Sequence, residues 1–404
     1  MNWNDKFAQR TRHMKRSAIR ELLKLAARPD MISFAGGLPA PELFPIEAVK
    51  QAIKTILRRN PQEAFQYSAT EGIADLRTLI ASRFSRPGLE VRRENVVIVS
   101  GAQQGLDLLG RVLLDAGDKV AVENPTYLAL LSAWRPWQVR FLPVPSDDQG
   151  LRIDALEPLF EQRPKLLYLI PNFQNPQGTT LVAARRTALT GLARKHGVVL
   201  IEDDPYEELR FCGDPLPRLF ELDARRTAPD LLDSHTIYVG TFSKVLMPGL
   251  RVGWIIAPEP VIEKIVQAKQ AVDLHTSTLS QWIVHELVLD GTLEQQIPRL
   301  RCAYRARRDA MLAALAEYFP SEVSWTTPEG GMFLMVRLPP VLRATDVLER
   351  ALRQNVAFVP GDDFHLDGED RNSFRLNFSN PPPELIGKGV ERLGHVLKAM
   401  LRAA

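Results

Sequence analysis

Short apolar runs alternate with polar turns and longer helical stretches from about residue 95 onward. The runs are rich in Val, Ile and Leu, and each is followed by a turn that contains Gly, Pro or charged residues. Such runs predict strands buried on both faces, and their alternation with helices predicts an α/β domain with a mainly parallel sheet. The predicted strands are VVIV (96–99), KVAV (119–122), VRFLPV (139–144), LLYLI (166–170), VVLI (198–201) and TIYV (236–239).

The pattern changes at both ends of this region. After about residue 290 a long charged helix (296–319) precedes GGMFLMVRL, another helix and SFRLNFS, which predicts a smaller α+β domain. Near the start, SAIRELLKLAAR (17–28) has the apolar spacing of an amphipathic helix, with Ser17 as N-cap and Pro29 ending it. We therefore expect an N-terminal helix and segment (1–45), a large domain (46–290) and a small domain (291–404).

Composition narrows the classes of partner. The 404 residues are 45% hydrophobic and 25% charged, with a net charge of +3 that does not favour binding to nucleic acid or to an anionic membrane. Cys212 and Cys302 are isolated and the seven histidines lack metal-ligand spacing, so we expect no disulfide framework, no metal site and a reducing cytoplasm. Eight Lys or Arg against two acids in the first 28 residues leave a mitochondrial presequence as an alternative to the helix.

Unusual polar residues follow the predicted strands directly, where ligands bind in open α/β sheets. These loops are SGAQQG (100–105), ENPTY (123–127), PNFQNPQG (171–178), EDDPY (202–206) and GTFSK (240–244). The first is a strand, a glycine turn and a helix start, a geometry that suits a phosphate. Glu123 stands where a dinucleotide-binding acid would stand, but G-x-G-x-x-G is missing, which disfavours a dinucleotide site.

Lys244 lies beside two hydroxyls, Thr241 and Ser243, with Arg251 seven residues further on. A lysine near a phosphate site, an acid at a neighbouring strand end and an aromatic residue at another suit pyridoxal phosphate. Its aldehyde condenses with a lysine amine, and its ring then acts as an electron sink.

The chain resembles the fold type I pyridoxal-phosphate aminotransferases of class I/II, within them the 2-aminoadipate (LysN-like) and kynurenine/aminoadipate aminotransferase group. The matching motifs run nearly end to end: SFAGGLPAPELFP (33–45), QYSATEG (66–72), SGAQQGLDL (100–108), NPTY (124–127), PNFQNPQG (171–178), EDDPY (202–206), SKVLMPGLRVGW (243–254), DLHT (273–276), GGMF (330–333) and RLNFS (375–379). The resemblance implies a mainly parallel seven-stranded sheet in the large domain, pyridoxal 5'-phosphate as cofactor, and a cytoplasmic homodimer with shared active sites. It also implies that the N-terminal segment (1–45) packs with the small domain and the active site.

The implied reaction moves an amino group from an L-amino acid to a 2-oxo acid such as 2-oxoglutarate by a ping-pong mechanism. The donor would be 2-aminoadipate, glutamate, or an aromatic or branched-chain amino acid. Two alternatives stay open because fold does not fix chemistry. One is a lyase or decarboxylase on the same fold, and the other is a MocR-type regulator without its DNA-binding domain, although only about 30 residues precede SFAGGLP.

The resemblance also implies a role for each site residue. Lys244 would bond to the cofactor and move the substrate proton, Asp203 would hold the pyridine nitrogen, and Asn175 and Tyr206 would reach the ring oxygen. Tyr127 would stack on the ring. The phosphate would be held by Ala102, Gln103, Thr241, Ser243 and Arg251, with Tyr67 reaching it from the partner subunit. Relatives often have a hydroxyl residue where this chain has Ala102, so we expect its backbone N–H, and not a side-chain hydroxyl, to contact the phosphate.

Substrate contacts are expected from Arg375, Gly37, Asn175, Tyr67 and Arg20. Arg375 would bind the α-carboxylate through its planar fork, which lysine could not copy. Arg20 would read the distal carboxylate of an acidic donor, with a solvent-exposed helix face as the alternative. His275, in DLHT, is expected to border the site, without an assigned role.

Overall fold

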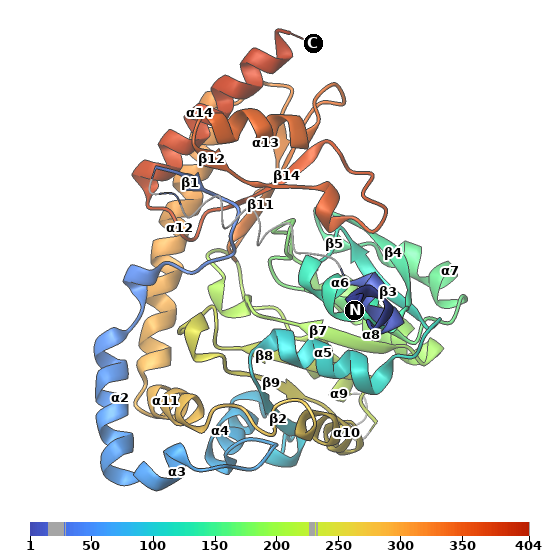
Figure 1. Ribbon diagram of the computed structural model, residues 1–404, viewed down its shortest axis with the longest axis vertical. Coiled ribbons are helices and arrows are strands. Elements are labelled where there is room, and N and C mark those ends of the chain that lie inside the picture. The colour runs from blue at the N-terminus through green and yellow to red at the C-terminus, as the bar shows by residue number, and fades with distance from the viewer. Residues whose placement is uncertain (15–27, 29, 226–230, 232, 404) are drawn as a thin grey trace.

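The computed structural model describes residues 1–14, 28, 30–225, 231 and 233–403. Arg20 and nearly all of the helix expected over residues 17–28 lie outside these ranges. Within them the chain forms two sheet-based units, one above the other in Figure 1. The long helix α12 (Thr292–Tyr318) runs along one side, from the lower unit to the upper one. Among the helices of the described ranges, none combines the length and the apolar character that a membrane crossing requires.

The larger sheet has the strand order β2-β9-β8-β7-β6-β3-β4-β5. Every predicted run is one of its strands, and neighbours from β8 to β4 pair in parallel, which confirms the mainly parallel sheet. β9 is antiparallel to both β2 and β8 and is not among the predicted runs, because it opens with Gly253, a poor strand former. The two-residue β5 extends the expected seven strands to eight. The strands are β2 (Val96–Val99), β3 (Lys119–Asn124), β4 (Arg140–Asp147), β5 (Gly150–Leu151), β6 (Leu166–Leu169), β7 (Val199–Asp203), β8 (Thr236–Thr241) and β9 (Gly253–Ile256).

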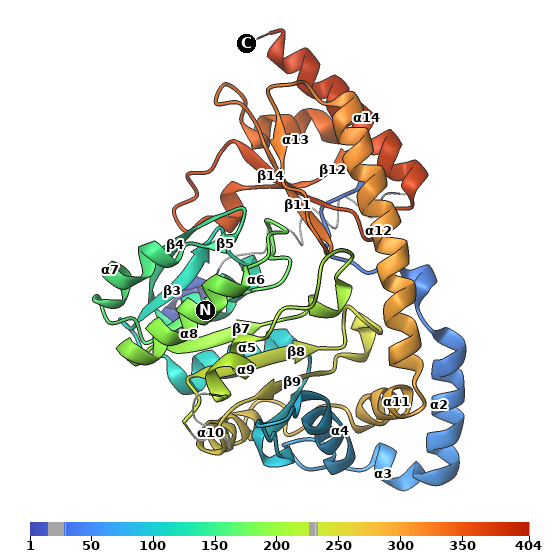
Figure 2. The same cartoon turned by 180° about the vertical axis from the view of Figure 1, so that it is seen from behind.

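Helices cover both faces of this sheet. Every residue of β2, β6 and β8 is buried, which explains their mainly apolar sequences. α5 and α10 lie on the face seen in Figure 1, and α8 and α9 lie on the face seen in Figure 2. The helices of this unit are α2 (Ile46–Arg59), α3 (Pro61–Phe65), α4 (Ala74–Phe84), α5 (Ala102–Leu113), α6 (Leu128–Trp134), α7 (Leu156–Phe160), α8 (Ala183–His196), α9 (Leu219–Ala224), α10 (Glu259–Gln270) and α11 (Thr278–Leu289).

The C-terminal unit contains an antiparallel sheet in the order β10-β11-β14-β13, as the α+β prediction requires. Its elements are β10 (Ser324–Trp325), β11 (Phe333–Arg337), α13 (Ala344–Arg353), β12 (Val356–Ala357), β13 (Val359–Pro360), β14 (Ser373–Asn377) and α14 (Pro383–Leu401). β1 (Ile32–Ser33) pairs in parallel with β12, so the segment before α2 is hydrogen-bonded to this unit. That pairing carries the N-terminal segment across the strand ends of the larger sheet.

Candidate active site

A cleft of about 670 Å³ lies where the carboxyl ends of the larger sheet meet β11 and β14. Predicted site residues from both units and from the N-terminal segment line it: Gly37, Ala102, Gln103, Tyr127, Asn175, Asp203, Tyr206, Thr241, Ser243, Lys244, Arg251 and Arg375. Loops that are far apart in the sequence therefore converge at the carboxyl ends of the parallel strands, where open α/β sheets bind their ligands. Tyr67 does not line this cleft.

The amine of Lys244 points at the N-terminal segment. Its Nζ donates a hydrogen bond to the carbonyl oxygen of Gly37 at 2.8 Å. Burial, together with the positive charges of Arg375 and Arg251, lowers the pKa of Lys244 to about 8. A Cβ on Gly37 would lie 2.8 Å from the ring of Phe333, so only glycine brings this carbonyl so close to β11 without displacing the ring. The lowered pKa makes the neutral, nucleophilic amine far more abundant near neutral pH than it is for an ordinary lysine.

Asp203 ends β7 and is almost completely buried. Its Oδ2 accepts a hydrogen bond from the hydroxyl of Tyr168 at 2.7 Å, whereas its Oδ1 has no partner within the described part of the chain. Burial raises the pKa of Asp203 to about 7, although the bond from Tyr168 lowers it. A buried carboxylate oxygen without a partner, facing a cleft, can accept a hydrogen bond from the protonated ring nitrogen of a ligand. Sequence reasoning missed Tyr168, and its only signal was a hydroxyl within a buried strand.

Hydroxyls, backbone N–H groups and one guanidinium gather at the other end of the cleft. The Thr241 hydroxyl donates to Ser243 Oγ at 2.9 Å, and Arg251 Nη2 donates to the carbonyl of Ser100 at 3.1 Å. The N–H groups of Ala102 and Gln103, in the first turn of α5, have no acceptor among the described residues. These donors match the oxygens of a phosphate. The side chain of Gln103 donates to the Ala129 carbonyl, so its backbone is the part available to a ligand.

Arg375 lies in the middle of β14 and is only 2% exposed. Its Nη1 donates to Asn175 Oδ1 and its Nη2 to the Ala35 carbonyl, each at 2.6 Å, while its Nε has no partner within the described ranges. The guanidinium lies over the rings of Phe333 and Phe364, at 4.2 and 4.9 Å from their centroids. Burial lowers its pKa to about 10, and no described carboxylate offsets that effect. A buried guanidinium with neutral partners is a receptor for a carboxylate.

Two tyrosines border the space between these groups. Burial raises the pKa of Tyr127 to about 12, with a further contribution from Asp203, and burial also raises the pKa of Tyr206. Both hydroxyls therefore stay protonated and can donate hydrogen bonds to a ligand. The ring of Tyr206 meets Phe333 edge-on, with centroids 6.0 Å apart, which ties the loop after β7 to the C-terminal unit.

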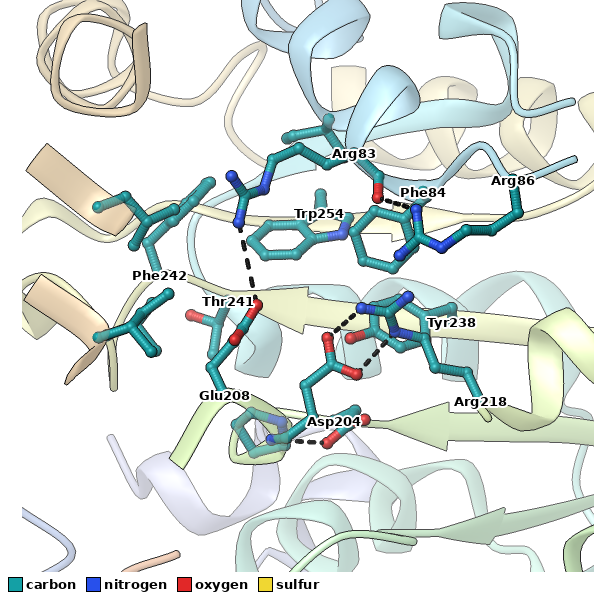
Figure 3. A pocket seen from close by; sticks show the side chains of 16 residues that line it. Arg83, Phe84, Arg86, Asp204, Glu208, Arg218, Tyr238, Thr241, Phe242 and Trp254 are labelled. Atoms are coloured by element: carbon teal, nitrogen blue, oxygen red, sulfur yellow. Dashed lines mark hydrogen bonds and ion pairs between the residues drawn. The ribbon is translucent and has the colours of Figure 1, made fainter. Parts of the chain in front are cut away.

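A second cavity, of about 260 Å³, shares Thr241 and Pro205 with the wall of the cleft (Figure 3). One arginine of its lining is paired with carboxylates of the protein itself. Arg218 donates from Nε to Glu207 at 2.7 Å and from Nη1 to Glu221 at 2.7 Å. Because Glu207 directly follows Tyr206, these ion pairs hold the loop that carries Tyr206 and do not present a free charge to a ligand.

Tyr67 lies outside the cleft, and its side chain is 79% exposed. It borders a separate depression together with Phe65 and His275, and its ring meets that of His275 edge-on at 5.9 Å. The structure of one chain therefore does not bring Tyr67 to the other predicted site residues.

Comparison with known proteins identifies the family. The model for aminotransferases of class I and II matches residues 29–393. The chain belongs to the class I and II aminotransferases. The 2-aminoadipate transaminase of Thermus thermophilus is 45% identical over 402 residues, which cover 99% of this chain and 98% of that protein. Aromatic-amino-acid aminotransferase 1 of Thermococcus litoralis is 41% identical, over 100% of this chain and 96% of its own.

A solved structure agrees with this assignment. LysN, the α-aminoadipate aminotransferase of Thermus thermophilus, was solved with N-(5'-phosphopyridoxyl)-L-leucine. It is 44% identical to this chain with a TM-score of 0.93, and the match covers 100% of each chain. The cofactor of the present protein, as a class I and II aminotransferase, is pyridoxal phosphate. The cleft fits it, since the orphaned oxygen of Asp203, the amine of Lys244 and the donors at the start of α5 match its ring nitrogen, aldehyde and phosphate.

Proposed function

We propose that this aminotransferase takes the amino group from 2-aminoadipate or glutamate and passes it to a 2-oxo acid such as 2-oxoglutarate in a two-step, ping-pong cycle. The observation that carries the proposal of an amino-acid substrate is Arg375, a buried cation that has only neutral partners and shares the cleft with Lys244. The choice of acidic donors is supported by the 2-aminoadipate transaminase relative. The α-carboxylate common to amino acids and 2-oxo acids would complete its set of partners. Aromatic or branched-chain donors are the second candidates, favoured by the aromatic-amino-acid relative.

The residues that would hold the cofactor follow from the donors in the cleft. Lys244 would bond to its aldehyde carbon, Asp203 would accept the hydrogen bond of its ring nitrogen, and Asn175 with Tyr206 would bind its ring oxygen. Tyr127 would stack against its ring. When bound, the cofactor supplies a sink for the electron pair left at the substrate Cα. The phosphate contacts would come from the backbone of Ala102 and Gln103 and from the side chains of Thr241, Ser243 and Arg251.

The protein's own groups would position and move the proton. Arg375 and Asn175 would fix the α-carboxylate, which orients the Cα–H bond toward Lys244. The neutral Nζ of Lys244 would take the proton from Cα and later return one, a role that its lowered pKa of about 8 supports. The Gly37 carbonyl would orient that amine through their 2.8 Å hydrogen bond.

The same proposal includes a homodimer in the cytoplasm. Tyr67 would reach the cofactor phosphate and substrate of the partner subunit, which its exposure and its distance from its own cleft support. Free Cys212 and Cys302 are compatible with a reducing compartment. Residues 46–290 would act as the cofactor-binding domain and residues 291–404 as the small domain that brings Arg375 to it.

The direct test is a panel of L-amino acids added to the cofactor-loaded protein, with the absorbance change of the first half-reaction as readout. We expect the largest specificity constants for 2-aminoadipate and glutamate, release of the matching 2-oxo acid, and reversal by 2-oxoglutarate. Lys244→Ala should abolish the change, whereas Lys264→Ala, which alters an exposed lysine of α10, should not. Release of carbon dioxide in place of a 2-oxo acid would contradict the proposal.

The expected preference for acidic donors is tested separately at Arg20. This residue resembles the arginine that binds the distal carboxylate of the substrate in the family. Arg20→Ala should lower kcat/KM for glutamate and 2-aminoadipate by roughly 10- to 150-fold, the value of one hydrogen bond to a charged group, and leave leucine nearly unchanged. An equal loss on acidic and apolar donors would remove Arg20 from substrate recognition.

A further inference from the structure

An ion pair between a buried lysine and a partly exposed carboxylate lies behind the phosphate end of the cleft. Lys269, in the last turn of α10, is completely buried, and its Nζ donates to the two carboxylate oxygens of Asp273 at 2.7 and 2.9 Å. The same Nζ lies 3.1 Å from Gln104 Oε1 and 3.1 Å from Thr276 Oγ1, so its donors are fully used. Asp273 and Thr276 belong to the loop between α10 and α11, whereas Gln104 belongs to α5.

This ion pair is bonded directly to the turn that precedes α5. Ser100 Oγ donates to Asp273 Oδ2 at 3.1 Å, and Gln104 Nε2 donates to the same oxygen at 2.6 Å. Gln104 Oε1 also accepts the backbone N–H of Ser100 at 2.7 Å. Ser100, two residues before α5, and Gln104, in its first turn, are therefore both hydrogen-bonded to one carboxylate. We call Lys269, Asp273, Gln104, Ser100 and Thr276 the Lys269 cluster.

The opposite side of the same turn carries the phosphate donors. The Ser100 carbonyl accepts from Arg251 Nη2 at 3.1 Å, and the free N–H groups of Ala102 and Gln103 follow within two or three residues. Gly101 between them has φ +85°, and a Cβ there would lie 2.3 Å from Arg251 Nη2. A small displacement of Ser100 would thus move both the arginine and the N–H groups away from a bound phosphate.

The charges of the cluster indicate a positional role. Lys269 and Asp273 cancel each other, so the pair adds little net attraction for a dianion. Buried ion pairs also contribute little to stability on average, because desolvation offsets their attraction. Hydrogen bonds to charged groups are nevertheless directional, and several of them converge on Asp273 from two separate segments. Burial raises the pKa of Asp273, but the bonds from Lys269, Gln104 and Ser100 outweigh it, and the net pKa is lowered.

We propose that the Lys269–Asp273 pair positions the phosphate-binding turn and so sets the affinity of this aminotransferase for the phosphate group of its cofactor without touching it. The inference rests on the proposed function, which assigns that turn to the phosphate. Lys269 is therefore a positioning residue that does not contact the cofactor. It acts through Asp273 and Ser100 on donors that contact the ligand.

The test compares two ligands that differ only in the phosphate. Dissociation constants of pyridoxal 5'-phosphate and of pyridoxal are measured on cofactor-free protein for the wild type and for Lys269→Met, which keeps the chain length and removes the charge. We expect a roughly 10- to 100-fold weaker affinity for pyridoxal 5'-phosphate, corresponding to one lost hydrogen bond to a charged group. Pyridoxal should change by no more than about twofold, because its contacts lie outside the turn.

Inorganic phosphate is the second probe, and its competition against pyridoxal 5'-phosphate should weaken in parallel. Arg194→Met is the matched control, since it breaks a pair with the buried Asp223 at the far side of the sheet. It should leave the ratio of the two dissociation constants unchanged. If Lys269→Met does not fold, Ser100→Ala removes the contacts of Ser100 Oγ with Asp273 and with Thr276 Oγ1, both within the Lys269 cluster, and should shift the ratio by roughly 2- to 10-fold.

The outcomes separate the two proposals. An unchanged ratio in folded Lys269→Met, or an equal loss for both ligands, would overturn the positioning role. Wild-type protein that shows no covalent cofactor absorbance dependent on Lys244 would overturn the proposed function itself, whatever the variants do. A changed ratio with unaltered pyridoxal binding supports the assignment of the cluster.

Discussion

Replacing Arg375 with lysine keeps a positive charge in the cleft and removes the planar fork. In the structure two of the five guanidinium N–H groups serve Asn175 and the Ala35 carbonyl, which leaves three, including that on Nε, for a ligand. A lysine ammonium has three N–H groups and the same two neutral acceptors to satisfy. It can therefore offer at most one hydrogen bond to the α-carboxylate, where arginine offers two.

The expected loss follows from that count. One hydrogen bond to a charged group contributes about 1.5 to 3 kcal/mol. At about 1.4 kcal/mol for each factor of ten, Arg375→Lys should lower kcat/KM for an L-amino acid by roughly 10- to 150-fold. Binding of the cofactor should be nearly unchanged, because Arg375 serves the substrate.

The assay compares glutamate with 4-aminobutyrate, which is the same chain without the α-carboxylate. Single-turnover rates with cofactor-loaded protein give kcat/KM for each donor. The decarboxylated amine should react poorly with the wild type and equally poorly with Arg375→Lys. Arg337→Lys is the matched control, because Arg337 lies on the neighbouring strand and is exposed. Equal losses on both donors, or no loss on glutamate, would refute the role of Arg375.

Further predictions concern the cofactor groups. Because burial and two neighbouring guanidinium groups lower the pKa of Lys244 to about 8, capture of the cofactor by cofactor-free protein should accelerate about tenfold from pH 7 to pH 9, as stopped-flow absorbance can measure; a midpoint near the ordinary lysine value of 10.5 would contradict this. Burial raises the pKa of Asp203 from 3.8 to about 7, so the folded cofactor-free protein keeps a proton that the unfolded chain releases above about pH 4. Its Tm should therefore fall as pH rises from 5 to 7, and less so in Asp203→Asn, while equal slopes would exclude Asp203 as the cause. Tyr168→Phe removes the 2.7 Å bond to Asp203 and should raise the pKa of that carboxyl further, which moves the Tm change to higher pH; an unmoved transition would show that the bond is weak in solution. Mixing inactive Lys244→Ala with impaired Tyr67→Phe should restore activity once subunits exchange, and no recovery despite proven exchange would argue against shared sites.

The strands, and the site residues at their carboxyl ends, could be predicted from the sequence because both depend on local pattern. Runs such as VVIV and TIYV are buried on both faces and could be placed without any tertiary information. Lys244 and Asp203 follow from the rule that ligands bind at the carboxyl ends of parallel strands. Their convergence with Arg375 came only from the family resemblance, since the hydrogen bond between Arg375 and Asn175 joins residues 200 positions apart.

Other contacts left no local trace. Tyr168 lies in a strand predicted correctly, yet nothing in LLYLI indicates that its hydroxyl reaches a carboxylate on the next strand. Lys269 has the position of an ordinary last-turn lysine of an amphipathic helix, and its partner Gln104 is 165 residues away. Such side-chain pairs depend on the register between helices, which apolar periodicity does not determine.

The incomplete partner set of Arg375 also has a consequence for the lifetime of the protein. A ligand that binds only the folded chain stabilises it by an amount that grows with its concentration, about 2.7 kcal/mol at 100 times its dissociation constant. Amino acids and 2-oxo acids would both supply the carboxylate that this buried cation lacks. Proteolysis follows the small population of opened molecules, so abundant substrate would slow degradation and starvation would hasten it. The supply of nitrogen carriers would in this way regulate the amount of the enzyme as well as its rate.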